Sequence, residues 1–390
     1  MLNIRLPIPR FLTAGQVFAG KGSIGTLRAL GASKTAVVVT RSLYRNDKSR
    51  QRIQAAIGSH AVELYEASGG EPQLDSLTSI LAEITAFAPD WIVAVGGGSV
   101  IDSAKLLWAF YEHPDAELER ITRPFGLPPL RGRARFAAVP TTAGSGSEVS
   151  SAAVFGEQGT SRKRAVVSHD FLPDLVILDP QFVAAAPPRV KAIAGMDALA
   201  HAIEGYVSRI ENPLADPQAE TAARLLLDVL PQVVAAPADE VELHQQMLIA
   251  AMMAGWVQNL KVPGAGHALA HQLGRFHVPH GLATGLCLVP ALKMNAQDEH
   301  VQAKLLRLAR TLGLNDVGSL FERIDALRDE VGLGGNLSAC CNGQMSALLT
   351  ARDEVVDGAL ADPCAKANPR SMDAAMFNAL LDQLLSSDRN

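Results

Sequence analysis

The chain has few or none of the features that mark several classes of protein. Its four cysteines, among 390 residues, include no Cys-x-x-Cys pair, so neither a disulfide framework nor a zinc ribbon is indicated. No apolar run reaches the roughly 18 residues of a membrane span. Asp and Glu outnumber Lys and Arg by 40 to 35, and the net charge of −5 gives no electrostatic case for binding nucleic acid or an anionic membrane. Residues 1–10 lack the apolar region of a secretory signal, and we therefore expect a cytoplasmic protein.

Apolar residues are plentiful, at 48% against 19% charged, which is enough for the cores of about two domains. In the first half, short β-branched runs alternate with helical stretches, a pattern typical of a parallel sheet covered on both faces. After Pro187-Pro188 the strand-like runs largely vanish and helical spacing dominates. We therefore predict an α/β domain over residues 1–184 and an all-helical domain over residues 185–390. The predicted strands are 34–40, 61–65, 90–95, 135–139 and 174–178.

Carboxylate and imidazole side chains recur at helical spacing in the second half. Asp197 and His201 are four residues apart in an alanine-rich run, and His267 and His271 repeat that spacing before His280, which we place in a loop. A single such pair is more often a surface helix pair than a ligand pair. Five metal-competent groups among apolar neighbours would be costly to bury unpaired, so the pattern favours a first-row divalent metal.

Two loops rich in glycine and hydroxyl residues follow predicted strands. Gly96-Gly97-Gly98-Ser99 lies between a strand and a helix, where close backbone approach and free N–H groups suit a pyrophosphate. The alternative, a plain tight turn, is equally compatible with three glycines alone. The second loop, Pro140–Glu148, would face the same crevice at the carboxyl ends of the strands. We therefore predict a dinucleotide site in the α/β domain.

The residue that follows the first predicted strand is Arg41. Nucleotide-binding folds hold the adenosine ribose at this position, where an acidic residue favours NAD and a cation suits a 2′-phosphate. Arg41 could instead be a plain surface residue. The position favours NADP(H) over NAD(H).

Taken together, these motifs resemble those of the iron-containing (group III) alcohol dehydrogenases, in the same order and over nearly the whole chain. The matching segments are Gly96–Ser99 with Asp102 and Lys105, Pro140–Gly144, Gly195–Glu204, His267–His271, Pro279–Gly281 and Asn368–Arg370. The resemblance implies a dehydroquinate synthase-like two-domain fold, Fe²⁺ or Zn²⁺ as the metal, and a homodimer or larger homo-oligomer. One departure concerns the cofactor, because Arg41 stands where NAD-preferring members carry Asp.

The resemblance also implies roles for individual residues. The metal ligands would be Asp197, His201, His267 and His280. His271 would lie near the nicotinamide and substrate as a catalytic residue without binding the metal. The implied cofactor-binding residues, with Arg41, are Gly97, Gly98, Ser99, Asp102, Thr141, Thr142, Ser145 and Lys163.

The implied reaction is hydride transfer between a nicotinamide and a small alcohol or aldehyde whose oxygen the metal polarises. One alternative is a reductase of an acidic carbonyl compound (a semialdehyde, phosphonoacetaldehyde or a maleylacetate-like compound), because Lys261, Arg275 and His277 could bind an anionic tail. A dehydroquinate synthase-like lyase and a non-catalytic nucleotide-binding protein are further alternatives. Turnover separates them, because a lyase consumes no cofactor and a binding protein performs no reaction.

Overall fold

The structure, a computed structural model, describes residues 4–5, 10–58, 60–67, 70, 72–156, 163–341 and 343–386. The chain divides into two compact units. The sheet unit comprises Leu12–Ala186 and Pro237–Leu248, and the helical unit comprises Met1–Phe11, Pro187–Ala236 and Ile249–Asn390. Each unit is thus assembled from more than one stretch of chain, whereas the sequence predicts two uninterrupted ranges, 1–184 and 185–390.

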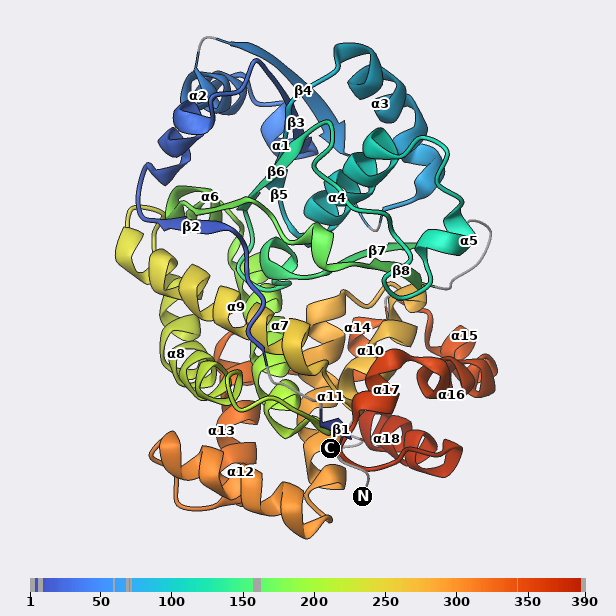
Figure 1. The fold of residues 1–390 in the computed structure, drawn as a ribbon. Coiled ribbons are helices and arrows are strands. Elements are labelled where there is room, and N and C mark those ends of the chain that lie inside the picture. Colours follow the sequence, from blue (N-terminus) through green and yellow to red (C-terminus); the bar gives the residue numbers. More distant parts are fainter. Residues whose placement is uncertain are drawn as a thin grey trace. The chain divides into compact units, whose positions relative to one another are not determined.

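A six-stranded sheet, parallel throughout, forms the centre of the sheet unit, in the order β2-β9-β6-β5-β3-β4 (Figure 1). This confirms the predicted α/β class. The strands are β2 (Gln16–Ala19), β3 (Lys34–Thr40), β4 (Ala61–Ala67), β5 (Trp91–Gly96), β6 (Arg135–Pro140) and β9 (Leu175–Leu178). An antiparallel hairpin of β7 (Ala152–Gly156) and β8 (Lys163–Val167) packs beside it.

Helices cover both faces of this sheet, which is why its central strands are continuous apolar runs. Alternate residues of β3 point to opposite faces: Val38 belongs to the core formed with α3 and α4, and Val37 to the core formed with α2. Figure 1 shows α2 on one side of the sheet and α3 and α4 on the other. The helices of this unit are α1 (Arg41–Tyr44), α2 (Asp47–Ile57), α3 (Leu74–Phe87), α4 (Gly98–Glu112), α5 (Leu118–Ile121) and α6 (Pro180–Ala184).

The order of the strands reverses between β3 and β5. From β3 the chain adds β4 on one side, and from β5 it adds β6 on the other. In open parallel sheets, ligands bind outside the carboxyl ends of the strands at such a reversal. The carboxyl ends here lead into Arg41 after β3 and Gly97 after β5, two residues that the sequence predicts to bind the dinucleotide.

The helical unit is built around α7 (Pro188–Val207), which packs against α8 and α11. A two-residue strand pair, β1 (Ile4–Arg5) with β10 (Ile210–Glu211), belongs to the same unit. No helix among the described residues has both the length and the apolar character needed to cross a lipid bilayer. The other longer helices are α8 (Asp216–Ala235), α9 (Val241–Lys261, which begins in the sheet unit), α10 (Ala265–Leu273), α11 (His280–Asn295), α12 (Glu299–Thr311), α13 (Val317–Glu330), α16 (Arg352–Ala361) and α18 (Ala374–Ser386).

Three sequence-based expectations about elements were wrong. His280 does not lie in a loop but begins α11, whose apolar run is so continuous that no helical period stands out. Helical spacing predicts a single helix over residues 344–356, but α15 (Met345–Thr350) ends with its cap at Ala351 and α16 begins at the next residue. The edge strand β2 was not predicted, since all four of its residues are exposed and it carries no buried alternation.

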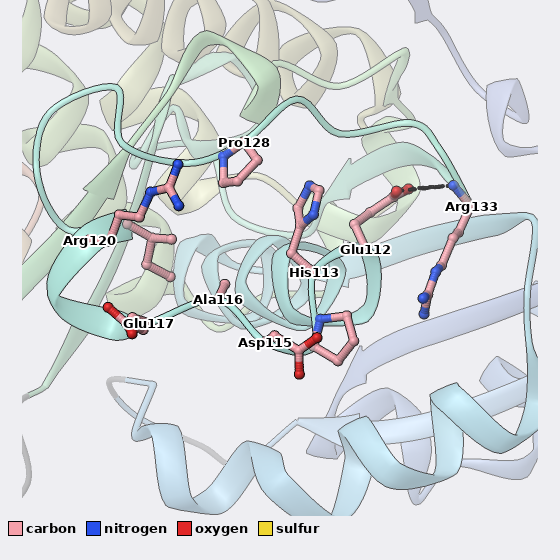
Figure 2. Close-up of a pocket in the computed structure, with 10 residues that line it drawn as sticks. Glu112, His113, Asp115, Ala116, Glu117, Arg120, Pro128 and Arg133 are labelled. Carbon is pink, nitrogen blue, oxygen red and sulfur yellow. Dashed lines mark hydrogen bonds between the residues drawn. The ribbon is translucent and has the colours of Figure 1, made fainter.

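An open pocket of about 490 Å³ lies within the sheet unit beside the end of α4 (Figure 2). None of its lining residues is among the predicted site residues. One wall is formed by the buried carboxylate of Glu112, which accepts the backbone N–H groups of Gly132, Arg133 and Ala134 at 2.9–3.0 Å. This contact fixes the turn that leads into β6, so it is a stabilising contact of the fold.

Replacing Glu112 with Ala should lower the free energy of unfolding by about 1–3 kcal/mol, because the buried N–H of Ala134 loses its acceptor. Urea denaturation followed by circular dichroism measures the change. Glu117→Ala, on the same pocket wall, is the matched control, since that exposed side chain caps no helix and should change stability by less than about 0.5 kcal/mol. Equal stability of the two variants would contradict this interpretation.

Candidate metal centre and dinucleotide site

Four of the predicted ligands converge in the helical unit. Asp197 and His201 lie one turn apart on α7, His267 is on α10, and His280 begins α11. One potential ligand atom from each lies within 4.8 Å of the corresponding atoms of the others. The first three residues are buried, whereas 35% of the His280 side chain is exposed. Residues up to 83 positions apart in sequence therefore form one cluster, of which His280 is the most exposed member.

The spacing of these atoms suits a first-row divalent ion. Asp197 Oδ1 lies 3.4 Å from Nε2 of His280 and 3.9 Å from Nε2 of His267. Ligands about 2.1 Å from a tetrahedral ion are about 3.4 Å apart, so an ion could bridge these atoms with small adjustments. Within the described part of the chain, the buried Nε2 of His267 has no hydrogen-bond partner. One carboxylate and three imidazoles match Fe²⁺ or Zn²⁺, so the residues present fit the implied metal.

The electrostatics of the cluster favour an ionised carboxylate. Burial alone raises the pKa of Asp197, but the charges of His201, His280 and His267 outweigh it and hold that pKa at about 2. The hydroxyl of Thr284 donates to Asp197 Oδ1 at 3.1 Å and supports the anion further. Thr284 lies one turn after His280 on α11, so it was missed because that helix was not predicted.

Glu204 fixes His267 and the start of α10 together. Its carboxylate, buried on α7, accepts the backbone N–H groups of Gly266 at 2.8 Å and His267 at 3.1 Å. It also lies 2.5 Å from Nδ1 of His267. A carboxylate on one ring nitrogen leaves the other to face a metal and fixes the orientation of the ring. Glu204 is the last residue of the Gly195–Glu204 motif, and no role for it was predicted from the sequence.

Two glycines allow the helices that carry the ligands to approach closely. A Cβ at Gly281 would lie 2.2 Å from the carbonyl oxygen of Ile193, so only glycine lets α11 begin against α7. A Cβ at Gly266 would lie 2.9 Å from Glu204 Oε1. Each glycine follows or precedes a predicted ligand, and its absent side chain is what brings that ligand to the cluster.

The late Asn-Pro-Arg motif begins with Asn368, whose buried side chain joins two helices. Its buried amide oxygen accepts the N–H of Ala265 at 3.0 Å and the side-chain amide of Asn295 at 2.9 Å. Its own amide nitrogen donates to Asn295 and to the carbonyl oxygen of Arg370. Asn368 therefore connects the first turn of α10 with the last residue of α11, and the motif has a structural role.

His271 lies next to the four-residue cluster but is not part of it. Its ring stacks on that of His280 with centroids 5.1 Å apart, and its Nδ1 lies 2.8 Å from Oδ2 of Asp362. Burial raises the pKa of Asp362, but the hydrogen bond and charge of His271, together with the hydrogen bonds from Cys364, outweigh it, and the net shift is downward. Nothing in the sequence pointed to Asp362, because it lies 91 residues from His271.

In the sheet unit the two predicted nucleotide loops lie side by side. The N–H of Thr141 donates to the carbonyl oxygen of Gly96 at 2.9 Å, and Gly98 opens α4. A Cβ at Gly98 would lie 2.5 Å from the hydroxyl of Ser145, and one at Gly97 would lie 3.2 Å from that of Thr142. The structure thus brings the two loops together at the N-terminus of a 15-residue helix, a position suited to a phosphate.

A buried lysine holds the second loop in place. Lys105, on α4, donates to the carbonyl oxygens of Ser147, Ser150 and Ala152 at 2.7–3.0 Å. Burial lowers the pKa of Lys105 to about 8. Asp102 lies one turn earlier on α4. Its carboxylate accepts the N–H of Val154 at 3.1 Å, and this contact connects α4 to β7. That Asp102 touches the cofactor stays a prediction.

Arg41 lies where the sequence places it, at the carboxyl end of β3, with 56% of its side chain exposed. Its Nε lies 2.6 Å from Oε1 of Glu66 on β4, and Nε of Arg45 lies 3.6 Å from the other oxygen. The sequence did not predict this pair, which places a carboxylate between two guanidinium groups. Lys163 begins β8, and its role in cofactor binding stays a prediction.

The cations suggested for an anionic substrate tail already contact acceptors of the protein. Lys261 is buried and donates to Asp216 and to the carbonyl oxygen of Tyr206. Arg275 donates to Glu354 at 3.1 Å. These contacts give Lys261 and Arg275 structural roles.

A parallel-sheet unit with a helix N-terminus suited to a phosphate, and a helical unit that gathers one carboxylate and three imidazoles, are the features expected of a metal-dependent enzyme that uses a dinucleotide. Residues 14–180 match the model of the iron-containing alcohol dehydrogenase family, and residues 191–385 match the model of its C-terminal domain. The chain therefore belongs to the iron-containing alcohol dehydrogenase family.

Individual relatives resemble the chain over almost its full length. It is 30% identical to the NADPH-dependent butanol dehydrogenase of Clostridium saccharobutylicum, over 93% of this chain and 94% of that protein. An iron-containing alcohol dehydrogenase from Thermococcus thioreducens superposes with a TM-score of 0.87 at 26% identity, over 98% of this chain and 100% of that one. The sulfoacetaldehyde reductase of Bifidobacterium kashiwanohense in complex with NAD⁺ gives the same values.

Replacing Glu204 with Gln should weaken metal binding about 10–100-fold, because His267 loses the carboxylate that orients it. Competition against a chromogenic chelator measures the affinity for Zn²⁺. Glu220→Gln is the matched control: that carboxylate accepts the hydroxyl of Tyr206 in the same unit and should leave metal affinity unchanged. A Glu204→Gln protein that binds metal as tightly as the parent would show that this carboxylate does not position the ligand.

Proposed function

We propose that the chain is a metal-dependent, NADP(H)-preferring alcohol dehydrogenase that reduces a small, uncharged aldehyde or oxidises the corresponding alcohol. The observation that carries the proposal is the convergence of Asp197, His201, His267 and His280 in one cluster. The chain belongs to the iron-containing alcohol dehydrogenase family, and one carboxylate with three imidazoles is a donor set that Fe²⁺ or Zn²⁺ accepts.

In the proposed reaction, a bound Fe²⁺ or Zn²⁺ supplies Lewis-acid polarisation of the substrate oxygen. Asp197, His201, His267 and His280 would hold the ion, and His280 is the most exposed of the four. His271 donates its Nδ1 proton to Asp362, which leaves Nε2 as the atom able to give or accept a proton. The loops around Gly98 and Ser145 hold the dinucleotide phosphates.

Two observations support a preference for NADP(H). Arg41 and Arg45 offer two guanidinium groups at the strand end where the adenosine ribose is expected, and guanidinium groups bind phosphate strongly. The butanol dehydrogenase relative is NADPH-dependent, whereas the sulfoacetaldehyde reductase was solved with NAD⁺. The 2′-phosphate of NADP(H) would have to displace Glu66 from Arg41. Glu66 could itself accept a hydrogen bond from the 2′-hydroxyl of NAD(H), so NAD(H) stays usable at lower efficiency.

The substrate class is inferred from whether the cations suggested for an anionic substrate tail already contact carboxylates of the protein. Lys261 and Arg275 already contact carboxylates of the protein, which favours an uncharged substrate over a semialdehyde or phosphonoacetaldehyde. The sulfoacetaldehyde reductase keeps an acidic aldehyde as the second candidate. Cytoplasmic location and a homo-oligomeric state stay predictions.

Anaerobic turnover of the ferrous-loaded protein tests the proposal, with NADPH or NADH and a panel of short neutral and acidic aldehydes. We expect chelator-sensitive oxidation of NADPH that is fastest with a neutral aldehyde. Asp197→Ala should lower kcat/KM more than about 100-fold, because loss of a ligand exceeds the 10–100-fold typical of a residue that only orients one. Asp228→Ala, at an exposed position on α8, is the control. Bound metal without net cofactor oxidation would favour the lyase or the binding protein.

Arg41→Ala tests the choice of cofactor. Loss of a charge-assisted contact worth about 1.5–3 kcal/mol should lower kcat/KM for NADPH about 10–100-fold and leave NADH nearly unchanged. Glu66→Gln should act in the opposite direction, because it releases Arg41 from its carboxylate partner. Arg123→Ala, an exposed arginine of the same unit, controls for general charge loss. Equal losses with both cofactors would remove Arg41 from phosphate recognition.

A further inference from the structure

A second group of metal-competent side chains lies beside the first. It consists of His271 on α10, Asp362 before the short helix α17 (Pro363–Ala367), and Cys364 within that helix. One potential ligand atom of each lies within 4.8 Å of the other two. The thiol is 7% exposed, and the three residues come from segments that are 91 positions apart in sequence. The cysteine distinguishes this group from the first cluster, which contains no sulfur.

The geometry of the second group is fixed by backbone contacts. Asp362 caps α17, and its Oδ1 accepts the N–H of Cys364 at 2.8 Å. Its other oxygen, Oδ2, accepts from His271 Nδ1 at 2.8 Å. Cys364 lies two residues after Asp362, next to the cap, and α10 carries the imidazole of His271 near both residues. Contacts within the protein therefore hold the three donors within reach of one another.

The chemistry of these donors selects a class of cation. A thiolate, an imidazole and a carboxylate are ligands that Zn²⁺ accepts, and sulfur favours thiophilic ions such as Cd²⁺ over ferrous iron. Thiolate and carboxylate together would neutralise a divalent charge. Three protein ligands leave a position for water, which the partial exposure of the His271 side chain permits.

We propose that His271, Asp362 and Cys364 form a second cation site, specific for thiophilic divalent ions, whose occupation inhibits the enzyme. Binding displaces two protons: the thiol proton of Cys364 is released, and the proton of His271 moves from Nδ1 to Nε2. The ion takes their place and bonds to Sγ, Nδ1 and a carboxylate oxygen. Inhibition rests on the proposed function, because with the ion on Nδ1 and a proton held on Nε2, His271 could no longer accept a proton from the substrate.

The thiol resists ionisation in the absence of such an ion. Burial, and after it the negative charge of Asp362, raise the pKa of Cys364 well above its usual range. An ion must therefore have a high affinity for sulfur to displace the proton. We expect the site to fill only after the first cluster is saturated.

Cadmium titration of the iron-loaded protein under anaerobic conditions tests the inference. The titration is run in the Cys340→Ser, Cys341→Ser background, so that Cys287 and Cys364 are the remaining thiols. We expect one cadmium per chain in addition to iron, measured by elemental analysis, and an ultraviolet cadmium–thiolate band that saturates with it. Turnover should fall along the same binding curve.

Three variants test whether Cys364 gives rise to the cadmium–thiolate band. Cys364→Ser should abolish it and weaken cadmium binding by at least about tenfold, whereas Cys287→Ser should keep it. His271→Gln should weaken binding but retain the band at saturation, because the thiol remains. A band that survives in Cys364→Ser, or no cadmium in addition to iron, would overturn the inference.

The cadmium measurements do not depend on the proposed reaction. The cadmium count and the thiolate band can be measured even if no aldehyde is reduced, so failure of the proposed function leaves the site testable. If cadmium binds to Cys364 while turnover is unchanged, the inhibitory role is rejected.

Discussion

The carboxylate of Glu204 is the contact on which the metal cluster depends. It is buried on α7, yet it accepts two backbone N–H groups at the start of α10 and the Nδ1 proton of His267. An ionised group in a dry environment is stable only with such compensation, and the positive end of the α10 dipole adds to it. Because all three bonds converge on one side chain, the position of α10 and the orientation of His267 are set together.

A charge of the opposite sign plays a comparable part in the sheet unit. Lys105 is buried on α4 and donates to the carbonyl oxygen of Ser147, in the second loop, and to those of Ser150 and Ala152, just after it. Carbonyl oxygens compensate a buried ammonium as N–H groups compensate a buried carboxylate. In both units a charged residue on a long helix thus fixes a segment that carries predicted site residues, and both charged residues belong to motifs read in the sequence.

The sequence was sufficient for the α/β sheet, because short apolar runs between helical stretches are a local signal. It also supplied five candidate donors, and the resemblance to the family selected the four that cluster. It was insufficient where the deciding contact is remote. The Arg41–Glu66 pair depends on β4 lying next to β3, and Asp362 reaches His271 only after α17 packs on α10. The helix α11 was missed for a different reason: it is apolar almost all round, so its period is hidden, and Thr284 was missed with it.

The spacing of two histidines on α10 links the two groups of donors in the helical unit. His267 and His271 are one turn apart, so they share a face of the helix. Their ring centroids are 6.2 Å apart, and His267 contributes to the four-residue cluster, whereas His271 contacts Asp362. Glu204 holds the N-terminus of α10, and Asp362 holds a side chain one turn further on. The helix is therefore fixed at two successive turns by carboxylates from different segments, and each carboxylate orients one of the two imidazoles.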